Sequence, residues 1–380
     1  MSRVPRSASD DSGHPPVPRG WGWLWSSRHF QQAGIPADNW AARTHPRTFL
    51  RVLVKTMRRA LLMRALGQGG RERDVIDASV QDILWINLSA GSIGDSIMDL
   101  SGRVLLAAPG RRIDLLTHPR NADLYRHDAV FDQTFTEAAA AAERHRRQSY
   151  QMVIIDAYGT QGLRAKRAIA PDAPFAGMWG FINGYEIHRT IFSFRRIAAL
   201  TRQTIHLPLL PSLNAAQWSL PSGVALPPEG SIAIVVGGEW DFRTYRHWPV
   251  VARALARRHP LVLLGSSNGK AHAQQVMQAL QEGESTAPHC IDLVGRLTLT
   301  ETAVALARCR AMVCADGGLW HVGCALGVPS VVLFADTRLF DAHGRHVCRD
   351  TDDLRAEALH HWTAVSEIAP EEVLAAFERL

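Results

Sequence analysis

The amino-acid sequence predicts an α/β protein with two domains that face each other across a cleft, each built on a parallel sheet. Short apolar runs typical of buried strands alternate with helical segments in both halves of the chain. This alternation favours parallel sheets with helices on their faces. The length of 380 residues is enough for two domains of ordinary size and an extension.

We expect four segments along the chain. A basic extension covers residues 1–80, a first domain 81–206, a linker 207–230 and a second domain 231–380. The linker holds five prolines, which disfavour a long helix there. Ligands of paired parallel sheets bind at the carboxyl ends of the strands, so the site is expected between the two domains.

The excess positive charge belongs to the extension. Residues 1–80 contain 13 Arg and Lys against 6 Asp and Glu, and the remaining 300 residues carry a net charge of −1. This distribution argues against nucleic acid as a partner of the two domains. No apolar run approaches the roughly 18–20 residues that span a bilayer, and the start lacks the pattern of a secretory signal. The five cysteines form no Cys-x-x-Cys, which favours a reducing compartment and disfavours zinc or disulfides. We therefore expect a cytoplasmic protein.

Within the extension, residues 1–20 have the composition of a disordered segment, and residues 48–66 have a helical pattern. The two sides of the predicted helix differ in character. Apolar positions are Leu50, Leu53, Met57 and Leu61, and basic positions are Arg51, Lys55, Arg58 and Arg59. Residues 21–66, which include Trp21, Trp23 and Trp25, suit a peripheral contact with the anionic inner face of the cytoplasmic membrane. The alternative, which we favour slightly, is a helix packed on the body with its charges in water.

In the first domain the apolar runs predict strands at residues 83–86, 113–116, 130–135 and 152–155. A helix is expected to begin at Gly94 and Asp95 and to continue to residue 105, and another covers residues 137–147. Residues 173–202 show no clear pattern. The expected sheet therefore contains four strands.

In the second domain strands are predicted at residues 232–236, 261–264, 291–294, 312–315 and 330–334. Helices are expected at 249–258, where Pro249 suits a first helical position, at 271–281 and at 371–380. Thr298 and Glu301 have the spacing of a capping box at the start of another helix.

The stretch from residue 312 to 334 reads as strand, tight turn, short helix and strand. Gly317 and Gly318 let backbone N–H groups approach a ligand at the start of a helix, whose dipole favours anions. Asp316 lies at the carboxyl end of the strand, where open α/β sheets bind ligands. This pattern suits a diphosphate, although an ordinary strand-to-helix turn explains the spacing equally well.

At four places the chain resembles glycosyltransferase family 9, the ADP-heptose:lipopolysaccharide heptosyltransferases. The first is a strand followed by Gly94-Asp95, and the second is Asp156 with Gly159 after a strand. Arg246-His247-Trp248-Pro249 is similar to the family's Lys-x-Trp-Pro motif. The stretch from Asp316 through His321 to Pro329 is similar to its most specific signature. The resemblance covers residues 81–380 and implies the GT-B fold, with two Rossmann-like domains facing across a cleft.

The resemblance also implies an inverting sugar transfer from an ADP-activated heptose to a glycan of the lipopolysaccharide core. Asp95 would be the base, although a capping role at its helix is the plain alternative. Arg246, with Arg243 as a second candidate, would offset the charge of the departing diphosphate. The other donor-binding positions are Asp316, Gly317, Gly318, Leu319 and His321. Solvated loop charges are the alternative for both arginines.

Three departures from the family pattern suggest a divergent member. Asp99 and Ser101 stand where the family usually has Thr and Pro, Arg246 replaces a lysine, and Gly317 replaces Ser or Thr. Trp248 and Trp320 are interpreted as packing residues.

The acceptor is expected to be anionic, and Arg120, Arg164 and Lys166 are candidates for its binding on the rim of the first domain. No cofactor or metal is required by this chemistry, and Asp350-Thr351-Asp352 is interpreted as a solvated loop. Two other functions stay open. One is a transferase of the same fold with another nucleotide sugar and a protein or small-molecule acceptor. The other is a non-catalytic module that binds a nucleotide sugar at the membrane.

Overall fold

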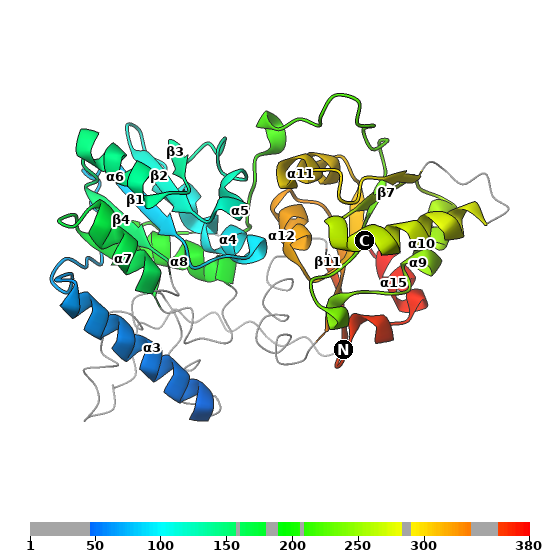
Figure 1. Cartoon of the computed structure of the whole chain (residues 1–380), viewed down its shortest axis with the longest axis horizontal. Helices are drawn as coiled ribbons and strands as arrows, with labels where there is room; N and C mark the ends of the chain where they lie inside the picture. Colours follow the sequence, from blue (N-terminus) through cyan, green and yellow to red (C-terminus); the bar gives the residue numbers. More distant parts are fainter. Residues whose placement is uncertain (1–45, 157–159, 180–188, 206–208, 283–289, 336–355) are drawn as a thin grey trace.

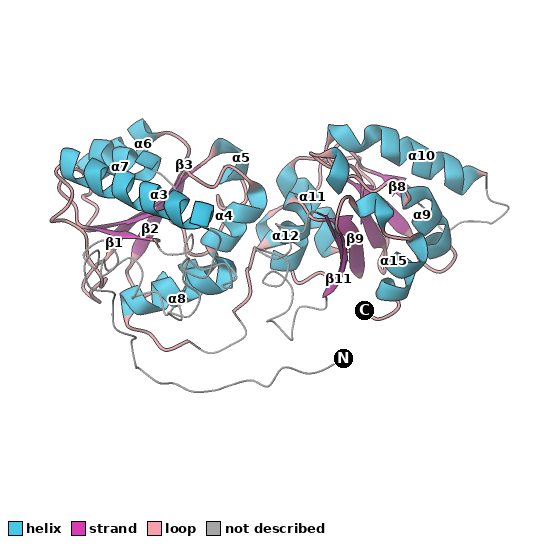
Figure 2. Ribbon diagram, turned by 90° about the horizontal axis from the view of Figure 1, so that it is seen from below, coloured by secondary structure: helices cyan, strands magenta, loops and turns pink. Residues whose placement is uncertain are grey.

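The computed structural model describes residues 46–156, 160–179, 189–205, 209–282, 290–335 and 356–380. They form two lobes side by side, each with a sheet between helices (Figure 1, Figure 2). The expected α/β architecture with two parallel sheets is confirmed. Trp21, Trp23 and Trp25, Gly159, Cys348 and the acidic run at 350–353 lie outside the described residues.

The N-terminal lobe has a five-stranded parallel sheet in the order β3-β2-β1-β4-β5. Its strands are β1 (Asp82–Asn87), β2 (Arg112–Thr117), β3 (Gln133–Phe135), β4 (Met152–Ile155) and β5 (Phe175–Gly177). Its helical elements are α3 (Pro46–Ala65), α4 (Ile93–Asp99), the 3-10 helix η3 (Ser101–Leu106), α5 (Pro119–Ala122), α6 (Ala138–Arg147), α7 (Thr160–Ile169) and α8 (Arg189–Thr201).

The C-terminal lobe has a six-stranded parallel sheet in the order β11-β10-β9-β6-β7-β8. Its strands are β6 (Ile232–Val235), β7 (Leu261–Leu264), β8 (Cys290–Asp292), β9 (Ala311–Ala315), β10 (Ser330–Ala335) and β11 (Ala356–His361). Its α-helices are α9 (Trp248–Ala256), α10 (Lys270–Gln281), α11 (Leu299–Ala307), α12 (Gly318–Ala325) and α15 (Pro370–Phe377), with short 3-10 turns at η6 (Asp241–Arg243), η7 (Ser267–Gly269) and η9 (Val365–Glu367).

The central strands formed where they were predicted because every residue in them is buried. β1, β4, β6 and β7 are apolar runs covered on both faces, the arrangement typical of parallel sheets. The predicted capping box is present: the Thr298 hydroxyl accepts from the Glu301 N–H, and the Glu301 carboxylate accepts from the Thr298 N–H at 2.7 Å. Trp248 and Trp320 are buried packing residues, as predicted.

The single helix expected from Gly94 to residue 105 is wrong, because α4 ends at Asp99 and η3 follows. The Ser101 hydroxyl donates to the Ile97 carbonyl, and the Gly102 N–H donates to the Ser193 hydroxyl of α8. A β-carbon at Gly102 would come within 2.6 Å of the Ser193 carbonyl oxygen, so the glycine permits α8 to pack closely there.

The proline-rich segment is tied to both lobes. The Arg103 guanidinium of η3 donates to the Ser212 carbonyl at 2.7 Å, and the Leu213 N–H donates to the Ala325 carbonyl of α12 at 2.9 Å. Strands before this segment belong to the first sheet and strands after it belong to the second. The segment is therefore the place where the chain passes from one lobe to the other.

The orientation of α3 expected for a helix that packs on the body with its charges in water is wrong. Met57 and Leu61 face solvent, whereas Arg59, expected in water, is buried over the ring of Trp179 at 4.1 Å from its centroid. Met63 and the half-buried Leu62 supply the packing of α3 on the lobe. Among the described residues, no helix has the length and apolar character to cross a membrane.

Candidate functional site

The candidate site lies where each sheet reverses its strand order. From β1 the chain proceeds to β2 and β3 on one side, and then crosses to β4 and β5 on the other. In the second sheet the same reversal occurs between β6 and β9. Ligands of open α/β sheets bind beside the carboxyl ends of the strands at such points. The segments that follow β1, β4, β6 and β9 carry Asp95, Asp156, Arg243 and Asp316; Asp95 lies in α4 and Arg243 in η6.

The two lobes meet at the N-terminal ends of α4 and α12. A β-carbon built on Gly94 would collide with the ring of His321, coming within 2.7 Å of Nε2. One built on Gly318 would lie 3.2 Å from the β-carbon of Ile93. Asp95 is the residue after Gly94, so it lies next to this junction rather than on a remote surface.

Asp95 occupies the first turn of α4, but it is not the cap. The Ser92 hydroxyl caps the helix by accepting from the Asp95 N–H at 3.2 Å. The Asp95 carboxylate is 43% exposed and forms an ion pair with Arg189 of α8. The capping alternative is therefore wrong for the Asp95 side chain, which remains available to a ligand.

Arg189 is shared by two carboxylates. Its guanidinium also binds Asp99, at 2.6 Å from Nη2 to Oδ2, and the arginine itself is buried. Burial raises the pKa of Asp99, and the charge and hydrogen bonds of Arg189 oppose this effect. Asn87 at the end of β1 donates a long hydrogen bond of 3.4 Å to Asp99. The sequence pattern gave no signal for Arg189, because its partners lie 90 and more positions away.

Asp156 holds the loop that precedes Asp95. It is buried at the end of β4 and accepts from the Leu88 N–H at 2.7 Å, the Ser89 N–H at 2.6 Å and the Ser89 hydroxyl at 2.9 Å. Burial raises the pKa of Asp156 to about 6, and hydrogen bonds from Ser89 oppose this rise. These hydrogen bonds fix the conformation of Leu88 and Ser89, at the start of the loop between β1 and α4.

On the C-terminal lobe, Arg243 and Asp316 lie together. Nη1 of Arg243 is 3.2 Å from Oδ2 of Asp316, and both side chains are mostly buried. Nε of Arg243 is buried and has no hydrogen-bond partner among the described residues. Gly317 is the N-cap of α12 and has an extended backbone. Because Gly317 follows Asp316 directly in the chain, the N–H groups that begin α12 lie next to the pair of Arg243 and Asp316. Leu319 is half-buried and packs against the core.

Arg246 takes a different direction from Arg243. Its guanidinium is 65% exposed and pairs with the exposed Asp241 at 3.0 Å, while its backbone N–H donates to Ser366. The structure therefore brings Arg243, the second candidate, to Asp316, and does not bring the guanidinium of Arg246 there.

The three candidates for the acceptor differ in their surroundings. Arg120 is exposed on α5, and the neighbouring Asn121 donates to the Ala90 carbonyl at 2.9 Å, which ties α5 to the loop before Asp95. Arg164 is exposed on α7. Lys166 does not lie on the rim: it is fully buried, and its ammonium donates to Gln68 and to the Pro171 carbonyl. Burial lowers the pKa of Lys166 to about 8.

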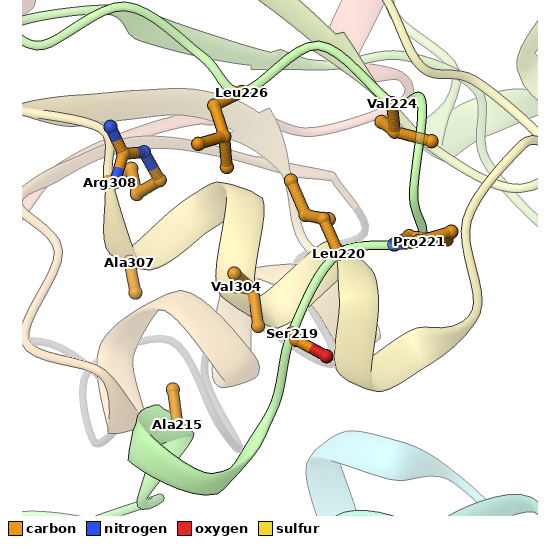
Figure 3. Close-up of a pocket in the computed structure, with 9 residues that line it drawn as sticks. All are labelled: Ala215, Ser219, Leu220, Pro221, Val224, Leu226, Val304, Ala307 and Arg308. Atoms are coloured by element: carbon orange, nitrogen blue, oxygen red, sulfur yellow. The ribbon is translucent and has the colours of Figure 1, made fainter.

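A separate hollow of about 480 Å³ lies between the linker and α11 (Figure 3). Its walls are mainly apolar, with Leu220, Leu226 and Val304 opposite one another and Arg308 at one side. None of the predicted site residues lines it, so it is not part of the candidate site.

Comparison with known proteins finds a likeness to one family over part of the chain. Residues 197–341 match the model of glycosyltransferase family 9 (heptosyltransferase). This match covers less than half of the chain, and over it the chain is similar to glycosyltransferase family 9. Lipooligosaccharide heptosyltransferase 2 of Haemophilus influenzae is 26% identical over 103 residues, which is 26% of this chain and 29% of that protein. Lipopolysaccharide heptosyltransferase 2 of Salmonella typhimurium is 30% identical over 100 residues, 25% of this chain and 28% of that protein. The chain thus spans less than a third of the length of these curated relatives.

Solved structures of a family 9 glycosyltransferase and of heptosyltransferases share the fold over most of the chain. A family 9 glycosyltransferase from Veillonella parvula covers 80% of this chain and 98% of its own, with 17% identity and a TM-score of 0.64. The ADP-heptose LPS heptosyltransferase II of E. coli covers 78% and 98%, with 19% identity and a TM-score of 0.59. E. coli heptosyltransferase WaaC, solved with ADP-2-deoxy-2-fluoro heptose, covers 78% and 99%, with 16% identity and a TM-score of 0.57. These likenesses confirm the expected GT-B fold.

Proposed function

We propose that this protein is an inverting glycosyltransferase, which moves a heptose or a related sugar from an ADP-activated donor to a glycan acceptor of the lipopolysaccharide-core type. The observation that carries the proposal is the junction of α4 and α12. An N-lobe carboxylate, Asp95, and the glycine-rich start of a C-lobe helix adjoin the same contact between Gly94 and His321. A transferase needs both groups at one substrate.

In the proposed reaction Asp95 accepts the proton of the acceptor hydroxyl as its oxygen attacks the anomeric carbon. The attack comes from the face opposite the leaving diphosphate, so the configuration inverts. Arg189 positions the Asp95 carboxylate, because the ion pair holds Oδ1 while the side chain stays partly exposed to solvent. Asp99 holds Arg189 from the buried side.

The leaving diphosphate needs positive groups that are already oriented before its charge grows. Arg243 is the proposed partner, since Asp316 holds its guanidinium beside the helix start and its Nε has no hydrogen-bond partner in the part of the chain that the structure describes. The N–H groups of Gly317 and Gly318 and the N-terminal end of α12 add partial positive charge. His321 borders the same space. The chain's own groups thus offset the charge, so the proposed chemistry needs no metal.

The donor and acceptor are proposed from the relatives. One solved relative has ADP-2-deoxy-2-fluoro heptose bound, and the curated relatives are named for lipopolysaccharide and lipooligosaccharide. An acceptor of that kind is anionic, and the exposed Arg120 and Arg164 suit it. Lys166 is withdrawn because it is buried. We place the reaction in the cytoplasm, at the inner face of the membrane.

The decisive experiment supplies purified full-length protein with ADP-heptose and a core oligosaccharide, and follows the product by mass spectrometry and its anomeric configuration by NMR. Asp95→Asn should lower turnover at least a hundredfold, because general-base catalysis contributes about 10²–10⁴-fold. Asp123→Asn is the matched control, since Asp123 is an exposed carboxylate on the same lobe that pairs with Arg126.

Each alternative has its own outcome in this experiment. If a different nucleotide sugar stabilises the protein in a thermal-shift panel and no transfer from ADP-heptose is seen, the donor is that nucleotide sugar and not ADP-heptose. Donor binding without turnover by wild type would favour a non-catalytic module. Equal turnover by wild type and Asp95→Asn would remove Asp95 from the mechanism and refute the proposal as stated.

A further inference from the structure

Helix α3 carries an apolar stripe on the side that faces away from the lobe. Val54, Met57 and Leu61 are spaced three and four residues apart, so they share one face of the helix. All three are exposed, and Leu61 is 67% exposed. Helix α3 lies below the N-terminal lobe in Figure 1 and in front of it in Figure 2.

The rotation of α3 is set by a buried cation. Arg59 lies over the ring of Trp179 at 4.1 Å from its centroid, and the Trp179 indole donates to Glu72 at 2.6 Å. Met63, four residues after Arg59, joins the same buried face. A buried guanidinium is tolerated only with such partners, so turning the helix to bury the stripe would expose Met63 and break the contact with Trp179.

The charge on α3 indicates what covers the stripe. The helix contains six Arg and Lys and no Asp or Glu in its 20 residues. Arg58 and Arg64 are exposed and adjoin the stripe along the helix surface. An apolar face flanked by arginines suits the headgroup region of an anionic bilayer, where lipid phosphates meet the arginines and acyl chains meet the stripe.

We propose that α3 docks this protein on an anionic membrane, lying in the plane of the interface with the stripe formed by Val54, Met57 and Leu61 toward the acyl chains. The surface lies outside the stretch that matches the family model, residues 197–341. The inference does not depend on the transferase reaction, because it uses no residue of the candidate site.

The test is cosedimentation of the full chain with two sets of vesicles, one of phosphatidylcholine alone and one with phosphatidylglycerol added. Wild type should bind the anionic vesicles at least tenfold more tightly, and added salt should weaken that binding. Met57→Ser with Leu61→Ser should lower it at least tenfold. Arg58→Gln and Arg64→Gln should each lower it about fivefold. The control, Val250→Ser with Leu226→Ser, removes two exposed apolar side chains elsewhere and should bind as wild type does.

Three outcomes would overturn the proposal. Wild type that binds neither vesicle, or both equally, has no anionic docking surface. Serine variants that bind as wild type does would show that the stripe is not in contact with lipid. Serine variants that lower the melting temperature or abolish a dimer, without changing vesicle binding, would show that the stripe is covered by protein. Sugar transfer measured on a soluble acceptor should be unchanged in the serine variants, which separates this test from that of the proposed function.

Discussion

Replacing Arg189 with methionine removes a cation that Asp95 and Asp99 share. Methionine keeps part of the side-chain volume but no charge, and Asp99 is left buried without its partner. Removing one member of a buried ion pair costs about 3–5 kcal/mol. We expect a loss of that size in the free energy of unfolding at pH 8, with most of it due to Asp99, because Asp95 is partly solvated.

The loss should depend on pH. Burial raises the pKa of Asp99 in the folded protein, and Arg189 limits that rise. Without Arg189 the pKa of Asp99 rises further. A carboxyl group with a raised folded-state pKa costs stability as the pH rises through that pKa, because the unfolded state releases the proton more easily. The deficit of Arg189→Met relative to wild type should therefore shrink as the pH is lowered from 8 toward 4.

Urea denaturation at several pH values measures this deficit. Arg71→Met is the control, since Arg71 and Asp172 form an ion pair of 2.8 Å that is exposed to solvent. Such surface pairs contribute about 0–1 kcal/mol. Adding Asp99→Asn to Arg189→Met should recover part of the loss, because the buried charge is then gone. If Arg189→Met costs no more than Arg71→Met, or if its deficit is the same at pH 4 and pH 8, the account of Arg189 is wrong.

Three further predictions follow from the site. Arg243→Ala should weaken ADP binding in calorimetry at least tenfold, since a hydrogen bond to a charged group is worth about 1.5–3 kcal/mol. Arg246→Ala should change ADP binding less than about threefold. The reverse order would contradict our assignment. Gly94→Ala should destabilise the lobe junction by about 1–3 kcal/mol through overpacking against the facing histidine ring. Gly91→Ala should be neutral, because a β-carbon there meets nothing within 4 Å. Equal effects of the two substitutions in thermal melts would refute the contact. Burial raises the pKa of Asp156 to about 6, so the stability of wild type relative to Asp156→Asn should fall by about 2 kcal/mol as the pH rises from 4 to 7. A difference that is independent of pH would contradict this.

The sheets could be predicted because their central strands are apolar on both faces. β1 and β4 each contain an uninterrupted run of four apolar residues, and the structure buries every residue in these strands. β11 was missed for the opposite reason: it is an edge strand whose residues are only partly buried, and it ends in His360 and His361. Its position is set by pairing with β10, a contact between distant segments that local pattern does not report.

Polar residues in the interior were harder to predict. Arg59 was expected on the polar side of a helix, and Lys166 on the rim of the first domain. Both are buried, since each has a partner far along the chain: Trp179 for the arginine and Gln68 for the lysine. Burial of a charge depends on whether the folded chain supplies a partner, and helical spacing carries no information about that.

The two arginines of the loop after β6 show where resemblance and geometry diverge. The resemblance singles out Arg246, but its guanidinium is held in solvent by Asp241, and Arg243 is the one that meets Asp316. A motif specifies spacing along the chain, whereas the direction of a side chain depends on the turn that carries it, here the short η6 turn. If Arg243 supplies the phosphate contact, the requirement on position 246 is relaxed to a surface charge. This would explain in one step why the family's lysine is absent there and why a second arginine stands three residues before it.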